Sequence, residues 1–395
     1  MPAFLQPRYD DGGYFGLIER LPGLLTGGQY EAVVLFLIDG FGWRFLEKFQ
    51  QGPFLKQAAR EAAITRLTSQ FPSTTAAHLT SLHTGLPVGE HAILEWYFYE
   101  QKLDALVAPL LFSFAGTPER DTLKPARLKP SSLFPWPSLY QGLKKRGVST
   151  SILQHREYTP STYSDALFKG ARARGYRTFP EALVNLGEAL PTAPAPGYFL
   201  VYYDRIDAIN HEYGPASAQG EAEILSFLLT MEAIFLKSMA ANRRKVLFLL
   251  TADHGQIEVD PQTTVYLNRG SRFAGVEKFL RPDRNGQPIV PAGSARDFFL
   301  YIQPGLLSEA RDFLASRLAG QAEVRRVADL AAAGYFGPKT TPDLLRRAGD
   351  LVILPHAGET VWWYEKDRFE QKFRGHHGGL TPQEMEIPLI AWEMG

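Results

Sequence analysis

The sequence contains no cysteine, and this absence excludes two kinds of chemistry. A chain without thiols forms no disulfide bonds and offers a metal no thiolate ligand. Any bound metal therefore has to be held by histidine, carboxylate or hydroxyl groups.

The chain also lacks an excess of charge of either sign. Lysine plus arginine and aspartate plus glutamate both number 42, which gives a formal net charge of zero. Proteins that bind nucleic acid polymers usually carry a broad cationic surface, and this composition provides none. We therefore expect an anionic substrate to be small and to be held by local groups.

Long apolar runs are missing as well. The longest uninterrupted runs, such as Val33 to Ile38 and Val246 to Leu250, are far shorter than the ~20 apolar residues of a membrane-spanning helix. The first residues, Met1 to Gln6, do not have the charged and apolar regions of a signal peptide. These features predict a soluble, cytoplasmic protein without a membrane partner.

The chain is rich in apolar residues, at 45% of 395, and this content supports a large core in one extended domain or in two. Short runs of β-branched and aromatic residues predict strands buried on both faces at 32–38, 198–203, 245–251 and 387–392. Helical spacing recurs at 220–241, and a second helix is predicted over 138–145. This alternation predicts an α/β fold with a mostly parallel sheet.

Residues 271–373 have a different pattern, with predicted strands at 297–302 and 323–327 around a helix at 306–318. We interpret this segment as an inserted α+β cap subdomain, with residues 1–270 and 374–395 forming the catalytic core. Residues 96–136 are rich in proline and aromatic residues without clean periodicity, so loops near the mouth of a site are expected there.

Acidic residues follow three of the four predicted strands. Asp39 ends the first, Asp204 and Asp207 follow the second, and Asp253 with His254 follows the third. The carboxyl ends of parallel strands meet at one edge of a sheet, where ligand sites gather. A single aspartate in such a place is often a helix cap or a turn residue. Its recurrence beside histidines instead predicts a metal site.

Histidines occur at spacings that suit the same site. His211 follows Asp207 by four residues, so both side chains lie on one side of a helical turn. His376 and His377 lie in a glycine-rich turn before the last strand. Taken alone, the first pair also fits a surface aspartate with a capping histidine, and the second fits a solvated loop.

Hydroxyl groups precede a predicted helix at Pro72-Ser73-Thr74-Thr75, and that helix ends near Gly85. The N-terminus of a helix offers unpaired N–H groups and a partial positive charge, both of which favour a phosphate. The alternative interpretation is an ordinary N-cap serine or threonine.

Together these segments resemble the alkaline phosphatase superfamily and, within it, the type I phosphodiesterase and nucleotide pyrophosphatase family. The similar motifs are spread along the whole chain: Phe36-Leu37-Ile38-Asp39-Gly40, Pro72-Ser73-Thr74-Thr75 with Thr84-Gly85-Leu86-Pro87 and His91, Asp207 to His211 with Gly214-Pro215, Thr251-Ala252-Asp253-His254-Gly255, and His377-Gly378. The resemblance implies an alkaline phosphatase-like three-layer sandwich and a metal-dependent phosphohydrolase.

By this resemblance, the nucleophile is Thr75 rather than Thr74, and the reaction passes through a phosphothreonine intermediate. Two divalent ions are implied, most simply zinc with manganese as the alternative. One ion would be held by Asp207, His211 and His377, and the other by Asp39, Asp253, His254 and the oxygen of Thr75. A threonine hydroxyl is a poor nucleophile at neutral pH, and a divalent cation lowers the pKa of such an oxygen.

The sequence departs from the family pattern on the substrate side. Trp96, preceded by Glu95, stands where diesterases carry a phosphate-binding asparagine, and Ala92 and Asn210 each replace a glycine. Trp96 and the aromatic residues after it fit either stacking on a base or core packing. The first hypothesis is a phosphodiesterase or nucleotide pyrophosphatase that acts on a small phosphate ester, with nucleotides among the candidates.

Alternatives of two classes remain open. The first comprises a phosphomonoesterase, a phosphonate hydrolase or a phosphomutase of the same superfamily. The second is a catalytically inactive binding protein that kept the fold. A sulfatase is disfavoured because the cysteine from which its nucleophile is usually made is absent.

Overall fold

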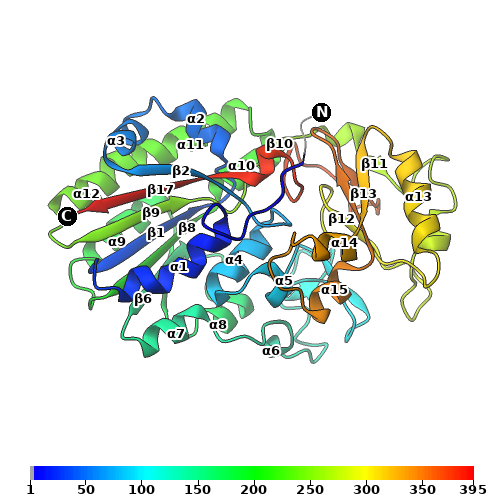
Figure 1. The fold of residues 1–395 in the computed structure, drawn as a ribbon, viewed down its shortest axis with the longest axis horizontal. Helices are drawn as coiled ribbons and strands as arrows, with labels where there is room; N and C mark the ends of the chain where they lie inside the picture. The colour runs from blue at the N-terminus through cyan, green and yellow to red at the C-terminus, as the bar shows by residue number, and fades with distance from the viewer. Residues whose placement is uncertain (1–3) are drawn as a thin grey trace.

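The central element of the computed structural model, which describes residues 4–395, is a seven-stranded sheet (Figure 1). Its strand order is β2-β17-β9-β1-β8-β6-β7. The five strands from β9 to β7 are parallel, while β17 is antiparallel to both of its neighbours. The predicted α/β class with a mostly parallel sheet is confirmed. The bounds are β1 (Ala32–Ile38), β2 (Ala63–Thr68), β6 (Ser149–His155), β7 (Arg172–Tyr176), β8 (Gly197–Tyr203), β9 (Val246–Thr251) and β17 (Glu386–Met394).

The strands found from sequence are those in the middle of the sheet. Every residue of β1, β8 and β9 is buried, because helices cover both faces, and a continuous apolar run is the result. Strands β2 and β7 lie at the two edges and are largely exposed, so their sequences are polar and gave no strand signal.

Helices form a layer on each side of the sheet, as Figure 1 shows. One layer contains α1 (Tyr14–Thr26), α4 (Thr75–Thr84), α7 (Leu139–Lys145) and α8 (Thr162–Leu167), which pack against one another and against β1 and β6. The other contains α2 (Trp43–Phe49), α3 (Pro53–Glu61), α9 (Phe179–Ala189), α10 (Arg205–Tyr213), α11 (Ala218–Thr230), a π-helical turn η1 (Met231–Leu236) and α12 (Lys237–Ala241). The arrangement is a three-layer sandwich.

The continuous helix Ala218–Ala241 is long and apolar enough, by length and composition alone, to cross a membrane. The segment contains no long uninterrupted apolar run, so the run lengths in the sequence did not reveal it. Here α11 and η1 pack against α3, α9 and α10, with Phe227, Met231 and Phe235 buried. A third of its most apolar 18-residue window is buried, so packing within the fold accounts for part of its apolar character.

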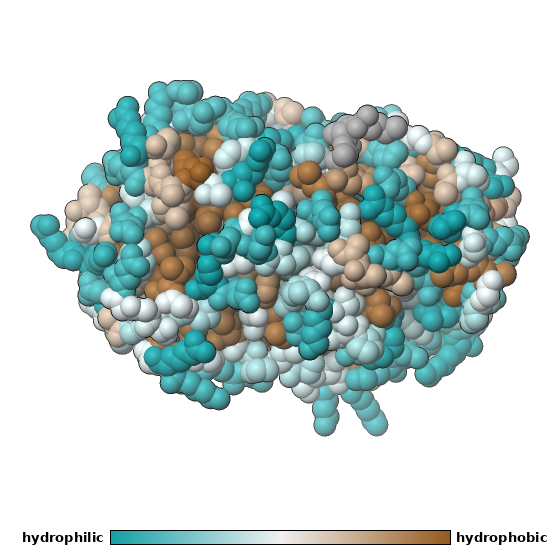
Figure 2. Space-filling model, viewed as in Figure 1, coloured by the Kyte–Doolittle hydropathy of each residue, from teal (hydrophilic) through white to brown (hydrophobic). Residues whose placement is uncertain are grey.

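The surface seen in Figure 2 is mixed in character. Hydrophilic residues cover most of this face, while apolar residues show in a strip over the strands between α1 and α3. This mixture agrees with a composition in which 21% of residues are charged and the two signs balance.

Residues 96–136 are not only loops, and the sequence-based expectation was wrong on this point. They contain a three-stranded antiparallel sheet of β3 (Phe98–Glu100), β4 (Ala105–Ala108) and β5 (Ser113–Phe114), followed by α6 (Pro130–Leu133). Its strands are two to four residues long and are joined by turns with positive φ at Asp104 (54°) and Phe112 (52°). Such short strands are below the length at which periodicity can be recognised.

The segment predicted to be a cap contains a second sheet, β12-β14-β13, and the helices α13 (Leu307–Arg317), α14 (Val327–Ala332) and α15 (Pro342–Ala348). The strands are β12 (Phe298–Leu300), β13 (Ala322–Arg326) and β14 (Leu351–Pro355). Phe298 and Leu300 pack in a separate apolar cluster, whereas Phe299 between them packs in the main core. One face of the cap sheet therefore joins the core. The division at residues 270 and 374 stays a prediction.

A buried ion pair joins this segment to the end of the chain. The Arg296 guanidinium donates to Glu384 at 2.8 and 3.0 Å and to the carbonyl of His356 at 2.7 Å, and both charged side chains are fully buried. Glu384 also accepts the backbone N–H of Gly379 at 2.9 Å and that of Thr381 at 3.2 Å. The pair thus fixes the loop that follows His377.

We expect Arg296→Met to lower the free energy of unfolding by about 3–5 kcal/mol, because it leaves the Glu384 carboxylate buried without its partner. Denaturant unfolding followed by fluorescence measures the loss. The matched control is Arg311→Met, which breaks an exposed pair with Asp312 and should change stability little. Equal stability of the two variants would show that the buried pair is not a structural link.

Candidate metal centre

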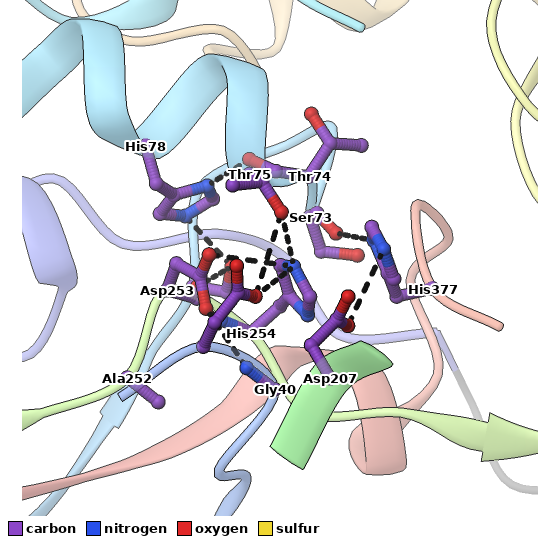
Figure 3. A network of polar contacts seen from close by, with 12 residues as sticks. Gly40, Ser73, Thr74, Thr75, His78, Asp207, Ala252, Asp253, His254 and His377 are labelled. Carbon is purple, nitrogen blue, oxygen red and sulfur yellow. Dashed lines mark hydrogen bonds and ion pairs between the residues drawn. The ribbon is translucent and has the colours of Figure 1, made fainter. Parts of the chain in front are cut away.

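Three aspartates meet at the carboxyl edge of the central sheet, and Figure 3 labels two of them, Asp207 and Asp253. Asp39 follows β1, Asp253 follows β9, and Asp207 lies in the first turn of α10 after β8. Since β9, β1 and β8 are adjacent and parallel, their ends lie side by side. The convergence predicted from the strand ends is what the fold produces.

The first group of donor atoms surrounds Thr75. Its Oγ1 lies 3.2 Å from His254 Nε2 and 3.5 Å from Asp39 Oδ1. His254 Nε2 is in turn 3.4 Å from an oxygen of Asp39 and 3.4 Å from one of Asp253. The donor atoms of Asp39, Asp253 and His254 all lie within 4.8 Å of one another, a spacing at which one cation can be held.

The second group lies beside the first. His211 Nε2 is 3.3 Å from Asp207 Oδ2, and His377 Nε2 is 3.7 Å from Asp207 Oδ1 and 3.1 Å from His211 Nε2. The His377 ring also stacks on that of His254, with centroids 3.7 Å apart. His254 therefore adjoins both groups, and the structure brings all seven predicted residues into one cluster.

Each of the three histidines is oriented by a backbone carbonyl. The Nδ1 atom of each ring contacts one carbonyl oxygen. His211 contacts Gly375 at 2.7 Å, His254 contacts Gly255 at 3.0 Å, and His377 contacts Ser73 at 2.9 Å. A carbonyl can only accept, so Nδ1 carries the proton. The Nε2 atoms then point into the cluster, and each offers a lone pair when its ring is neutral, as in metal-binding histidines.

The electrostatics of the cluster call for a cation. Burial raises the pKa of Asp39 and of Asp253, and the neighbouring carboxylates add to the rise. Burial also opposes ionisation of Asp207, but the charge of His211 and its hydrogen bond outweigh it and lower the pKa of Asp207. Within residues 4–395 no lysine or arginine pairs with these three carboxylates, and Asp253 Oδ2 has no hydrogen-bond partner. A nitrogen and oxygen set of this kind fits zinc or manganese.

Two residues that hold the aspartates were missed from sequence. The hydroxyl of Tyr202 donates to Asp39 Oδ2, and the amide of Gln256 donates to the carboxylate of Asp207. Tyr202 was interpreted only as part of a strand. Gln256 directly follows the Asp253-His254-Gly255 motif, and this position was the one available signal.

Thr75 is the first residue of α4, and the preceding Thr74 occupies the N-cap position. The Thr74 hydroxyl donates to the carbonyl of Leu94 at 2.9 Å and caps no N–H group of the helix. The interpretation of these hydroxyls as ordinary N-caps is therefore wrong. The first turn of α4 is left with N–H groups free of side-chain caps beside the Thr75 oxygen.

Other candidates from the sequence lie outside the cluster. His376 is buried, and burial lowers its pKa to about 3. Asp204 accepts a hydrogen bond from Tyr158 at 2.7 Å and lines a separate cavity of about 160 Å³ with His155 and Arg205. Among the aromatic residues after Glu95, Phe98 and Tyr99 are buried and serve the core, while Trp96 is 40% exposed.

Comparison with protein families gives a match over most of the chain. A family model described as type I phosphodiesterase / nucleotide pyrophosphatase matches residues 33–380. Among curated proteins, a venom phosphodiesterase of Crotalus durissus collilineatus is 24% identical over 296 residues, which are 71% of this chain and 33% of that protein. The chain therefore spans about a third of the length of this relative.

Solved structures share the fold. Murine ectonucleotide pyrophosphatase / phosphodiesterase 5 superposes with a TM-score of 0.65 at 17% identity, covering 91% of this chain and 87% of the other. An inactive variant of the same mouse protein was solved in complex with AMP, and it also gives a TM-score of 0.65. Phosphonoacetate hydrolase from Sinorhizobium meliloti gives 0.63 at 16% identity, covering 92% and 90% of the two chains.

We expect Asp253→Asn to weaken binding of a divalent cation by more than about 100-fold, since partners outside the ligand set already contribute 10–100-fold. Calorimetric titration of the metal-free protein with Zn²⁺ measures the change. Asp260→Asn is the matched control, because Asp260 lies nearby in sequence but only caps a short turn through Gln262. The assignment of Asp253 is wrong if both variants bind zinc alike.

Proposed function

Because the chain belongs to the type I phosphodiesterase and nucleotide pyrophosphatase family, we propose that it is a metal-dependent phosphohydrolase that cleaves small phosphodiesters, with nucleotide esters among the candidates. The observation that carries this proposal is the position of Thr75. Its hydroxyl lies at the N-terminus of α4 and within 3.5 Å of both Asp39 and His254.

The proposed ligand sets follow the two groups of donor atoms. Asp39, Asp253, His254 and Thr75 would hold one divalent cation, and Asp207, His211 and His377 the other. Zinc fits this set, with manganese as the alternative. Two bound cations supply positive charge that lowers the pKa of a hydroxyl and offsets the charge of a phosphoryl group.

In the proposed reaction, Thr75 Oγ1 loses its proton and attacks the phosphorus of the diester, while the bond to one ester oxygen breaks and that oxygen leaves as an alcohol after taking up a proton. Thr75 then carries the phosphoryl group with its remaining ester substituent. Water attacks this phosphorus, the bond to Thr75 Oγ1 breaks, and the phosphate monoester is released as Thr75 regains a proton. The free N–H groups in the first turn of α4 would face the phosphoryl oxygens and bind them as the charge shifts during attack. Tyr202 and Gln256 would keep their aspartates oriented throughout.

The proposal is supported over its alternatives by the cluster itself. A binding protein that had lost catalysis would not need a threonine hydroxyl at a helix N-terminus without a side-chain cap, next to six converging aspartate and histidine residues. A phosphomonoesterase or phosphonate hydrolase remains the second candidate, because Trp96 stands where diesterases of the family carry a phosphate-binding asparagine. The two predictions that follow separate these possibilities.

We expect Thr75→Ala to lower kcat by at least about a thousandfold while the protein stays folded and binds metal, because only the attacking oxygen is removed. Hydrolysis of bis-nitrophenyl phosphate and metal content are measured on the same preparation. Thr74→Ala is the control, since that hydroxyl binds the carbonyl of Leu94 and should have a milder effect. Loss of activity in Thr74→Ala alone would place the nucleophile one residue earlier.

We also expect diesters to be cleaved faster than monoesters. Within residues 4–395 no lysine or arginine pairs with the carboxylates of the cluster, so the second charge of a monoester gains no partner. The measurement is kcat/KM for bis-nitrophenyl phosphate relative to nitrophenyl phosphate, with zinc or manganese saturating. A ratio below one supports a monoesterase.

The same assays are repeated after exhaustive chelation. Activity that survives chelation contradicts the metal-dependent function.

A further inference from the structure

Two buried carboxyl groups, Glu95 and Asp297, lie beside the metal centre but are not part of it. They are in hydrogen-bonding contact with each other, and Glu95 is 2% exposed and Asp297 fully buried. Within residues 4–395, Glu95 Oε1 and Asp297 Oδ2 accept no N–H group and no alcohol hydroxyl, so only the proton of a neighbouring carboxyl group is left to them. Their second oxygens are satisfied, since Trp96 N–H donates to Glu95 Oε2 and Ser294 donates to Asp297 Oδ1 through N–H and hydroxyl.

The pair connects the nucleophile segment to the loop of His377. On one side, Leu94 next to Glu95 accepts the hydroxyl of Thr74, which directly precedes Thr75. On the other side, Ser294 Oγ lies 3.4 Å from the carbonyl of His377. A Cβ at Gly378 would lie only 2.8 Å from Asp297 Oδ1, so the contact there is close. The pair therefore lies between the segment that precedes Thr75 and the loop of His377.

Within residues 4–395 no lysine, arginine or histidine forms an ion pair with either carboxyl group at 4.0 Å or less. Burial raises the pKa of Glu95 to about 7, and burial together with the charge of Glu95 raises that of Asp297 well above its usual range. Two carboxyl groups in contact share one proton, because both cannot ionise side by side. One negative charge then stays on the pair.

We propose that the Glu95–Asp297 pair determines which phosphoryl charge the site accepts, by disfavouring a second negative charge on the substrate. This inference rests on the proposed function and names the cause of its substrate preference. The oxygens of the pair are closed to solvent, so the pair acts on the phosphoryl group through space and not by contact. A fixed negative charge at short range in a partly buried site repels a dianion more than a monoanion.

The test uses two esters that differ by one methyl group. Nitrophenyl phosphate is a dianion at pH 8, and methyl nitrophenyl phosphate is a monoanion. The decisive variant is the double substitution Glu95→Gln and Asp297→Asn, which keeps the size of both side chains and removes the charge. We expect the ratio of kcat/KM, diester to monoester, to fall at least about tenfold, through faster turnover of the monoester.

Single substitutions give an internal comparison. Asp297→Asn replaces the protonated partner by an amide that still donates to Glu95, so one charge remains and the ratio should shift less than in the double variant. Glu90→Gln, whose carboxylate pairs only with the exposed Lys339 at 3.5 Å, should leave the ratio unchanged. If the pair only joins the two loops, the double substitution will lower kcat/KM for both esters by the same factor. That result would overturn the proposal.

Binding provides a readout that does not require turnover. In zinc-loaded Thr75→Ala protein, with and without the double substitution, the dissociation constants of the same two esters are measured by calorimetry. We expect the dianion to bind at least about tenfold more tightly without the pair's charge, and the monoanion to change little. If wild-type protein hydrolyses neither ester, the proposed function fails, while this binding ratio still decides the role of the pair.

Equal dissociation constants with and without the charge would overturn the inference. If the double amide variant does not fold, Glu95→Met with Asp297→Leu replaces it, since these side chains are uncharged and close in size. The expected and the overturning results are the same for that variant.

Discussion

The repulsion among three buried carboxylates is the constraint on which the rest of the site depends. Parallel pairing of β9, β1 and β8 places Asp253, Asp39 and the turn before Asp207 at one edge, largely out of contact with water. Charges at such distances interact far more strongly there than in solvent. Protons or cations between the carboxylates have to offset this repulsion. Because the Nε2 atoms of three histidines point at the same cluster, cations are favoured over protons.

The ligands come from distant parts of the sequence and are positioned by two different means. Asp39, Asp207 and Asp253 follow core strands, so the sheet itself places them. His377 has no such strand before it, and its loop is held by the short pairing of Gly375 and His376 with Ile257 and Glu258. The buried Arg296–Glu384 pair then fixes the residues after it. The segment 271–373 thus contributes to the shape of the metal centre and does not merely cover it.

What the sequence revealed follows from where each residue lies. Four of the five inner strands, β1, β8, β9 and β17, were recognised within one or two residues because burial leaves continuous apolar runs. The fifth, β6, was missed because Ser149, Thr150, Ser151 and Gln154 interrupt its apolar residues. The edge strands β2 and β7 and the small sheet β3-β4-β5 were missed, since exposed or very short strands have no such pattern. The antiparallel direction of β17 depends on a connection that periodicity does not encode. Tyr202 and Gln256 act through single hydrogen bonds, which leave no spacing to detect.

The two sides of the centre are built from parts that can vary independently. The metal ligands follow the ends of core strands, and replacing one of them would leave the neighbouring buried carboxylates without a partner. The proposed charge on the substrate side comes from Glu95, next to Leu94, and from Asp297 in the predicted inserted segment. Sequence identified Trp96, preceded by Glu95, as a departure from the family pattern, yet Asp297 is far away along the chain and carried no signal. Membership of the family therefore constrains the chemistry of this site more tightly than its substrate, because the buried contact between Glu95 and Asp297 is not part of the family motifs.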